Sequence, residues 1–253
     1  MPPAEPSAEP GVVPADHGAA DRSGSSADGS TGVEDTLDLQ LTEELLALIA
    51  EGRSAGAARP GAPGELLGDP GAWPPSATAA GEFALLPVRP ERDLAVVSRW
   101  MNDPAVAAFW ELAGPESVTA DHLRAQLEGD GRSIPCLGVL DGTPMSYWEI
   151  YRADLDPLAR HYPARPHDTG IHLLIGGVIN RGRGVGTTLL RAVADLVLDN
   201  LPRCGRVVAE PDLRNTPSVS AFLSAGFRFS AEVDLPDKRA ALMIRDRTYR
   251  AQL

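Results

Sequence analysis

Residues 170–190 read Gly-Ile-His-Leu-Leu-Ile-Gly-Gly-Val-Ile-Asn-Arg-Gly-Arg-Gly-Val-Gly-Thr-Thr-Leu-Leu. The first part alternates, with Ile171 and Ile175 on one side of the chain and His172 on the other, which predicts a β-strand. Glycines occupy alternate positions in 182–186, and the apolar residues after them recur at three- and four-residue steps, as on the buried face of a helix. A strand, a glycine loop and a helix in this order gather free backbone N–H groups at the positive end of a helix dipole. The stretch therefore predicts a site for a phosphate or pyrophosphate.

Known phosphate motifs narrow the choice of ligand. A dinucleotide fingerprint fails because Thr187 or Leu189 stands where its third glycine belongs, and the Gly-Lys-Ser/Thr of a P-loop is missing. The stretch instead fits Arg-x-x-Gly-x-Gly, from Arg181 through Gly184 to Gly186. This pattern resembles the coenzyme A pyrophosphate loop of the GCN5-related N-acetyltransferases; the competing interpretation is a tight turn without a ligand. The resemblance implies that coenzyme A lies against the following residues: Leu174, Ile175, Arg181, Gly182, Arg183, Gly184, Val185 and Gly186.

Composition limits the class of protein. The formal charge of the 253 residues is −12, but eleven acidic residues and one base fall in the first 51 residues, so the remainder is nearly neutral. No basic stripe indicates nucleic acid, and no apolar run approaches the ~20 residues of a membrane span. The N-terminus lacks the apolar core of a signal peptide. We therefore expect a cytoplasmic protein with no nucleic-acid or membrane partner, in which Cys136 and Cys204 stay reduced.

The N-terminal third differs from the rest. Residues 1–35 are rich in Ala, Pro, Ser, Gly and acid, which predicts a disordered acidic tail. Residues 36–52 predict an amphipathic helix, and 53–80 an Ala/Gly/Pro-rich linker. The helix is expected to dock on its own domain; the alternative is a homodimer or partner contact through 37–50. The folded domain is expected to span 81–253.

Within that domain the patterns predict an α/β fold, a mixed, mostly antiparallel twisted sheet flanked by helices. Besides the central strand and helix, the expected elements in chain order are strand 83–89, helices 90–101 and 118–127, strands 134–140 and 145–151 around an Asp141-Gly142 turn, strand 206–209, helix 218–224, and strands 227–233 and 239–245. This order is that of the acetyltransferase fold.

Five longer blocks make the resemblance more specific. They are 102–110, 147–151, 161–172, 210–215 and 233–242. Together they resemble the siderophore-biosynthesis branch of the superfamily, the aerobactin-type N6-hydroxylysine acetyltransferases and mycobactin-type lysine acyltransferases. The resemblance implies an acyl-CoA N-acyltransferase, with acetyl-CoA as the expected co-substrate, no metal, and a small hydroxylamine or amine acceptor. The alternatives are an aminoglycoside-type N-acetyltransferase and a non-catalytic acyl-CoA-binding module.

The catalytic hypothesis centres on His172, because imidazole has a pKa near 6.5 and suits proton transfer at neutral pH. Glu210 and Asp212 end the next predicted strand, where one of them would orient the imidazole; the alternative for Asp212 is a cap of the following turn. In the resembled fold the pantetheine arm adds to the central strand like a further strand, and a free N–H near Leu174 or Ile175 would bind the thioester oxygen. Asn215 is expected to cap the last helix or to touch this arm.

The acceptor pocket is expected to hold aromatic and polar residues of the same blocks. The candidates are Trp110, Trp148, Tyr151, His161 and Asp168, with core packing as the competing interpretation for Trp148. His161, His167 and His172 have no spacing typical of a metal site. Lys238 and Arg239 suit either a carboxylate or a phosphate, or lie in an exposed turn.

One position departs from the family pattern. Many acetyltransferases of this superfamily have a tyrosine four residues before the Gly-Phe that ends the last helix, as the acid for the departing thiolate. Here that position is Phe222, before Gly226 and Phe227. The proton source for the thiolate therefore stays open between water, His172 and a serine.

Overall fold

The computed structural model describes residues 66–177 and 181–252. Its α-helices are α2 (Pro90–Met101), α3 (Pro104–Trp110), α4 (Glu116–Leu127), α5 (Val185–Asn200) and α6 (Thr216–Ser224). Its strands are β1 (Ser76–Thr78), β2 (Gly81–Pro87), β3 (Ser133–Leu140), β4 (Thr143–Arg152), β5 (Thr169–Ile175), β6 (Arg206–Ala209), β7 (Arg228–Asp234) and β8 (Arg239–Asp246). The predicted tail 1–35 and helix 36–52, with its proposed partner contact, lie outside the described residues.

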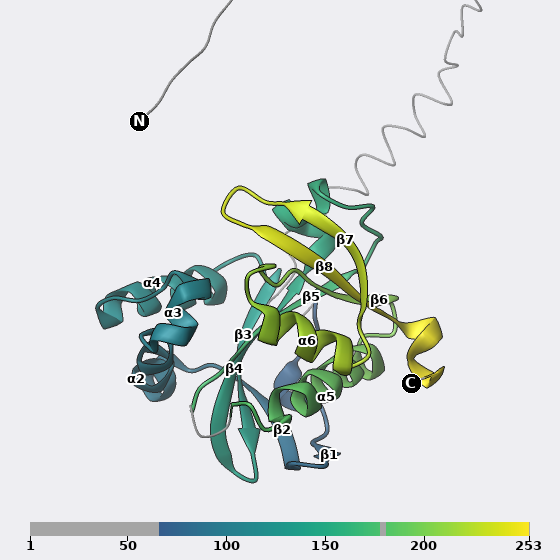
Figure 1. The fold of residues 1–253 in the computed structure, drawn as a ribbon. Coiled ribbons are helices and arrows are strands. Elements are labelled where there is room, and N and C mark those ends of the chain that lie inside the picture. The colour runs from purple at the N-terminus through teal and green to yellow at the C-terminus, as the bar shows by residue number, and fades with distance from the viewer. Residues whose placement is uncertain (1–65, 178–180, 253) are drawn as a thin grey trace, which may run out of the picture. The chain divides into compact units, whose positions relative to one another are not determined.

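The eight described strands form one sheet in the order β1-β2-β3-β4-β5-β6-β8-β7. Every neighbouring pair is antiparallel except β5 and β6, which are parallel. Figure 1 shows this sheet with α5 and α6 beside its C-terminal half. The predicted class, a mixed and mostly antiparallel sheet flanked by helices, is confirmed.

Two features were wrong or missed in the sequence analysis. The folded region begins before residue 81, because Leu67 is fully buried and β1 pairs with β2. Single apolar residues in a Pro/Gly-rich stretch carry no periodicity, so the predicted linker 53–80 overlooked this packing in its described part, residues 66–80. Helix α3 was also missed; it starts at an Asp103 cap whose Oδ1 accepts the N–H of Ala105 at 2.9 Å.

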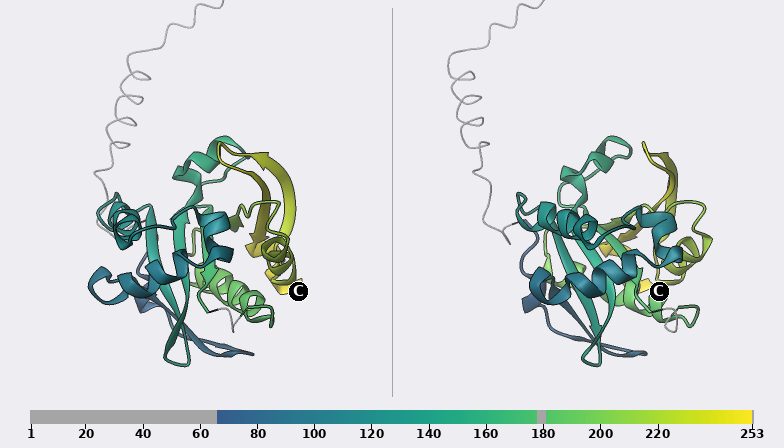
Figure 2. Two further views of the ribbon diagram at one scale, coloured as in Figure 1. Left: turned by 60° about the vertical axis from the view of Figure 1, so that its left-hand side comes forward. Right: turned by 90° about the vertical axis from the view of Figure 1, so that its left-hand side faces the viewer.

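The sheet has a different apolar core on each face. On one face, α5 packs on β-strand residues that include Phe83, Trp148 and Ile171. On the other face, α2, α3 and α4 pack on Leu137 and Tyr147. Figure 2 shows the N-terminal helices and α5 on opposite sides of the strands. Since side chains alternate along β4, Tyr147 faces the second core and Trp148 the first.

A gap opens in the middle of the sheet. β5 pairs with β4 along its whole length, but with β6 only at Thr169 and Gly170. The remainder of β5, residues 171–175, therefore presents an edge without a paired strand on the β6 side. This edge leads to the glycine loop and the start of α5.

Candidate active site

Two adjoining cavities occupy this gap. The larger, of about 840 Å³, lies between the end of β5, the glycine loop and α6. The smaller, of about 270 Å³, contains His172, Glu149 and Glu210. The residues that line both cavities are Phe109, Trp110, Leu173, Asn215 and Ser218. A ligand in the larger cavity therefore has direct access to the polar groups of the smaller one.

The glycine loop ends at the first turn of α5, as predicted. Gly182 and Gly184 adopt the left-handed conformation, with φ of 71° and 77°, which strains residues with a side chain. A Cβ at either position would meet no atom of the described residues within 4 Å, so these residues leave the space above the loop open. Gly186 has no positive φ, and a Cβ there would make only an ordinary van der Waals contact with Ile175 at 3.7 Å, so glycine is less strictly required at this position. The first turn of α5 leaves N–H groups without helical partners facing the larger cavity, a suitable site for a pyrophosphate.

Arg181 fastens this loop. Its Nε donates to the carbonyl of Ile175 at 2.9 Å, and its Nη2 donates to that of Gly176 at 3.2 Å. Its Nη1 forms an ion pair with Asp103 at 3.0 Å, at the start of α3. The guanidinium thus joins the loop to β5 and α3, and Arg181 also lines the larger cavity, where the sequence predicted a contact with coenzyme A. Arg183 in the same loop is exposed.

The free edge of β5 presents alternate backbone groups to the gap. The N–H of Gly176 donates to the carbonyl of Met145 in β4 at 2.8 Å. Because the two sides of a strand alternate, the N–H of Leu174 also points towards β4, whereas those of Leu173 and Ile175 point towards the gap. The predicted N–H donor for a thioester oxygen is thus available at Ile175, and Leu174 contributes only its side chain to the cavity.

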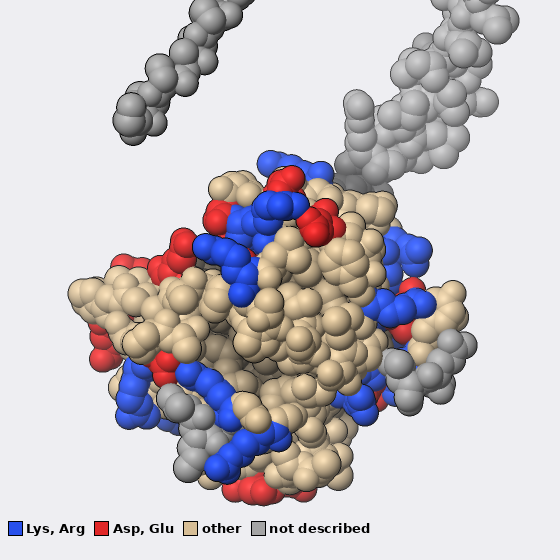
Figure 3. Space-filling model, viewed as in Figure 1, with Lys and Arg blue, Asp and Glu red and all other residues tan. Residues whose placement is uncertain are grey.

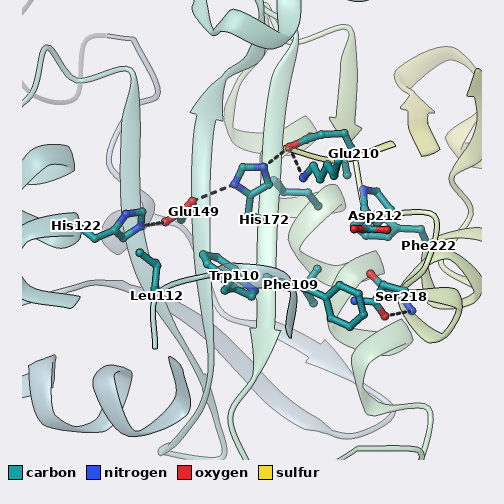
Figure 4. Close-up of a pocket in the computed structure, with 16 residues that line it drawn as sticks. Phe109, Trp110, Leu112, His122, Glu149, His172, Glu210, Asp212, Ser218 and Phe222 are labelled. Atoms are coloured by element: carbon teal, nitrogen blue, oxygen red, sulfur yellow. Dashed lines mark hydrogen bonds and ion pairs between the residues drawn. The ribbon is translucent and has the colours of Figure 1, made fainter. Parts of the chain in front are cut away.

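His172 lies between two carboxylates (Figure 4). Its Nδ1 is 3.0 Å from Oε2 of Glu149 in β4, and its Nε2 contacts Oε1 of Glu210 at the end of β6. Glu210 was one of two acids, with Asp212, expected to orient the imidazole, whereas the Glu149 contact was not predicted. The imidazole is 35% exposed, on the cavity side, whereas both carboxylates are buried. Trp110 packs edge-on against the ring, with centroids 6.1 Å apart.

The two carboxylates change the protonation of His172. Burial alone would lower the pKa of His172, but the charge of Glu210 and hydrogen bonds with both carboxylates outweigh it and raise this pKa to about 10. Burial would raise the pKa of Glu210, yet the imidazolium lowers it to about 2. His172 in the free protein is therefore an imidazolium at neutral pH. The ordinary imidazole pKa near 6.5, on which the catalytic hypothesis was based, does not apply in this environment.

Glu149 extends the polar chain towards the surface. Its Oε1 is 2.6 Å from Nε2 of His122 in α4, and it accepts hydrogen bonds from Gln126 and Tyr147 at 2.7 Å and 3.0 Å. Burial opposes ionisation, but the hydrogen bonds with His122 and His172, and the charges of these two residues, hold the pKa of Glu149 well below its usual range. The side chain of His122 is 28% exposed, so the row of hydrogen-bonded side chains from His172 through Glu149 to His122 reaches solvent. The available sequence signal was an acid on the same strand face as two tyrosines, which is unusual in a strand that is otherwise buried.

Tyr151 positions Glu210 through a hydrogen bond. Its hydroxyl donates to Oε2 of Glu210 at 2.7 Å, and its ring lies 4.7 Å from that of His172. Burial, followed by the charge of Glu210, raises the pKa of Tyr151 well above its usual value, so the hydroxyl stays a donor. Gly170 permits this arrangement, because a Cβ there would lie 2.0 Å from the Tyr151 ring. Tyr151 was predicted to bind the acceptor; it contacts the polar pair instead.

Three of the predicted acceptor residues lie elsewhere. Trp148 is fully buried on the opposite face of β4, where its Nε1 donates to Ser146 at 2.8 Å. His161 is exposed and does not line either cavity. Asp168 is buried and pairs with Arg206, whose Nε donates at 2.9 Å. Of the predicted set, Trp110 alone lines the cavities, which also include Phe109, a residue the sequence analysis missed.

The remaining candidates lie at the β6–α6 connection. Asp212 lines the smaller cavity, and its Oδ1 accepts the backbone N–H of Arg214 at 2.7 Å, the turn-capping contact given as its alternative. Its Oδ2 also accepts from Nη2 of Arg214 at 2.6 Å. Asn215 caps α6, with Oδ1 accepting from the N–H of Ser218 at 3.2 Å, and lines both cavities. Phe222 is buried on the cavity wall, where it has no proton to give.

The surface charges, the cysteines and the described helices complete the description of the chain. On the face in Figure 3, positive and negative side chains are interspersed, and the surface over α6 is uncharged. Cys136 and Cys204 are buried and unpaired, as expected. Within residues 66–177 and 181–252, every helix is too short or too polar to span a bilayer, and no cluster of His, Cys, Asp and Glu side chains is arranged as a metal site.

Comparison with known proteins agrees with this architecture. The family described as acetyltransferase (GNAT) domain matches residues 89–235. The lysine N-acyltransferase MbtK of Mycobacterium sp. (strain MCS) is 38% identical over 175 residues, which are 69% of this chain and 71% of that protein. The N(6)-hydroxylysine O-acetyltransferase of Escherichia coli is 39% identical over 158 residues, 62% of this chain and 50% of that protein.

Solved structures show the same fold. An uncharacterized protein from Bacillus halodurans has a TM-score of 0.68 and 32% identity, covering 73% of this chain and 95% of that one. The aminoglycoside acetyltransferase AAC(6')-Ib, in complex with coenzyme A, has a TM-score of 0.59 and 24% identity over 67% of this chain and 98% of that one, a likeness of fold alone. From the domain match and the mycobacterial relative together, the chain belongs to the GNAT acetyltransferase family.

Proposed function

We propose that this chain transfers an acyl group from acyl-CoA to a side-chain nitrogen of a lysine-like acceptor, a hydroxylamine or an amine, in hydroxamate siderophore assembly. Acetyl-CoA is the expected donor. The observation that carries this proposal is the His172–Glu210 pair, which lines a cavity of about 270 Å³ that adjoins the cavity of the glycine loop. The names of the mycobacterial and Escherichia coli relatives, a lysine acyltransferase and a hydroxylysine acetyltransferase, support the acceptor class.

The donor is expected to lie along the larger cavity. Its pyrophosphate would bind the N–H groups at the start of α5, and its pantetheine arm would add to the free edge of β5. The N–H of Ile175 would then donate to the thioester oxygen and to the oxyanion that develops on it. Backbone groups therefore do most of the donor binding in this proposal.

The acceptor nitrogen attacks the thioester carbon, so a C–N bond forms, the C–S bond breaks and CoA leaves as thiolate. In this proposal His172 accepts the proton that the nitrogen loses. It does so in its neutral form, which becomes populated as the pH approaches the His172 pKa of about 10. Glu149 and Glu210 hold the ring and stabilise the imidazolium that forms. His122 connects Glu149 to solvent, which offers the proton a route out.

A panel of acyl-CoA donors and acceptors tests the proposal. The acceptors are N6-hydroxylysine, N-hydroxycadaverine, lysine and an aminoglycoside, with release of the CoA thiol as the common readout and ferric hydroxamate colour as the specific one. We expect thiol release with acetyl-CoA and at least one lysine-like acceptor, and coloured product with the hydroxylated ones. Binding of acyl-CoA without turnover of any acceptor would instead identify a non-catalytic binding module.

The aminoglycoside alternative has less support from the site. A polycationic acceptor needs several unpaired carboxylates, whereas the three that line the smaller cavity, Glu149, Glu210 and Asp212, each have a partner within the chain. Turnover of the aminoglycoside alone would reverse this order of preference.

A further inference from the structure

Lys238 is the only lysine of the chain; all other members of its 23 Lys and Arg residues are arginines. It lies in the turn between β7 and β8, which is closed by a hydrogen bond from the N–H of Leu235 to the carbonyl of Lys238 at 2.8 Å. Its side chain is 22% exposed and lines the smaller cavity. The turn therefore directs one flexible ammonium group into the cavity where we place the acceptor.

The ammonium group sits beside the reactive pair. Nζ of Lys238 is 3.8 Å from Oε1 of Glu210, the same oxygen that contacts Nε2 of His172. Glu210 therefore has two positive neighbours, because the pKa of His172, about 10, keeps its imidazole charged at neutral pH.

The other carboxylates of the cavity wall are also occupied. Glu149 contacts His172 and His122, and Asp212 pairs with Arg214. An acceptor that entered as an ammonium ion would bring a further positive charge beside Lys238 and His172, with no unpaired carboxylate on the wall to offset it. Like charges at such distances in a partly buried site disfavour binding by about tenfold or more.

We propose that Lys238 makes the acceptor cavity selective for a side-chain nitrogen that arrives uncharged, such as an N-hydroxylamine, over a side-chain ammonium. The inference rests on the proposed function and narrows its acceptor class. An alkyl ammonium must lose a proton before it attacks, whereas an N-hydroxylamine is already neutral at pH 7. The charge of Lys238 would repel the alkyl ammonium and would not repel the neutral N-hydroxylamine.

Two matched pairs of acceptors test the role of Lys238. Each pair has one carbon skeleton with and without the N-hydroxyl group: N6-hydroxylysine with lysine, and N-hydroxycadaverine with cadaverine. The quantity measured is the ratio of kcat/KM within a pair, for the unsubstituted protein, Lys238→Met and Lys238→Arg. The change of the ratio between variants decides, because intrinsic reactivity contributes equally to each variant.

We expect Lys238→Met to lower the preference for the hydroxylated member about tenfold in both pairs, and Lys238→Arg, which keeps the charge, to retain most of it. Titration with acetyl-CoA checks that Lys238→Met still folds. An unchanged ratio in Lys238→Met overturns the inference. A loss of kcat/KM confined to N6-hydroxylysine and lysine also overturns it, because Lys238 would then be a contact for the carboxylate of these amino acids. If the unsubstituted protein acylates none of the four acceptors with any acyl-CoA, the proposed function itself is wrong.

Discussion

The two adjoining cavities are built by different means. The larger one is formed mainly by backbone: left-handed glycines, the first turn of α5 and the free edge of β5. The smaller one is formed by side chains from separate parts of the chain, His122 from α4, Glu149 from β4, His172 from β5, Glu210 after β6 and Lys238 after β7. Binding in the larger cavity should depend on the backbone conformation of the loop, whereas chemistry in the smaller cavity should depend on the charge of each side chain. Substitutions in the two cavities should therefore have separable effects.

The largest expected effect is on turnover, from His172→Ala. Loss of the proton acceptor should reduce kcat by about 10²–10⁴, since general acid–base catalysis contributes that much. Binding of acetyl-CoA, measured by calorimetry, should stay near that of the unsubstituted protein, because the larger cavity is unchanged. Unchanged turnover would remove His172 from the mechanism.

The second prediction concerns the larger cavity, where Gly184→Val should weaken acetyl-CoA binding by about 10–100-fold. A valine at φ 77° strains the loop and places a side chain where the pyrophosphate approaches. Gly205→Val is the matched control, because that glycine also has open space around it but lies outside both cavities and lacks a positive φ. Equal losses in both variants would indicate general destabilisation.

A third prediction sharpens the account of the smaller cavity. Glu149→Gln removes a negative neighbour of His172, so the pKa of His172 should fall from about 10 towards its ordinary value. With a hydroxylamine acceptor, kcat/KM should rise with pH in the unsubstituted protein, and the rise should occur at lower pH in the variant.

Tyr147→Phe serves as the control for that experiment. It removes one hydrogen bond to Glu149 and keeps the charge of the carboxylate, so the profile should stay close to that of the unsubstituted protein. If kcat/KM depended on pH in the same way in Glu149→Gln and in the unsubstituted protein, the rise of kcat/KM with pH could not be assigned to His172.

The smallest expected effect is on stability. The pKa of His172 is raised in the folded protein, so its ion pairs stabilise the fold fully below about pH 6.5, and that stabilisation is lost as pH rises towards about 10. The pKa of Glu210 is lowered to about 2, so its contribution is present above about pH 4.5 and is lost as pH falls towards 2. The difference in Tm between the unsubstituted protein and His172→Gln should therefore be greatest between about pH 4.5 and 6.5, at roughly 2–4 °C. It should shrink at lower and at higher pH. A difference independent of pH would assign the effect to packing.

Local patterns were enough for most secondary structure. The alternation of β5, the Asp141-Gly142 turn and the helix after the glycines all follow from neighbours within a few residues, and all were confirmed. Helix α3 escaped because its seven residues are too few to show a period. The packing of Leu67 escaped because a single apolar residue has no pattern at all.

The sequence by itself determined the strand, the glycine loop and the helix at the centre of the fold, and it limited the acids beside His172 to Glu210 or Asp212, because local periodicity and motif spacing are properties of the chain. Only the tertiary structure decided that Glu149 also contacts His172, that Tyr151 supports Glu210, and that Trp148, His161 and Asp168 lie outside the cavities. Which face a strand turns to a cavity, and which charges meet there, depend on the register of neighbouring strands. The raised pKa of His172 follows from that meeting of charges, and no property of residue 172 alone would reveal it.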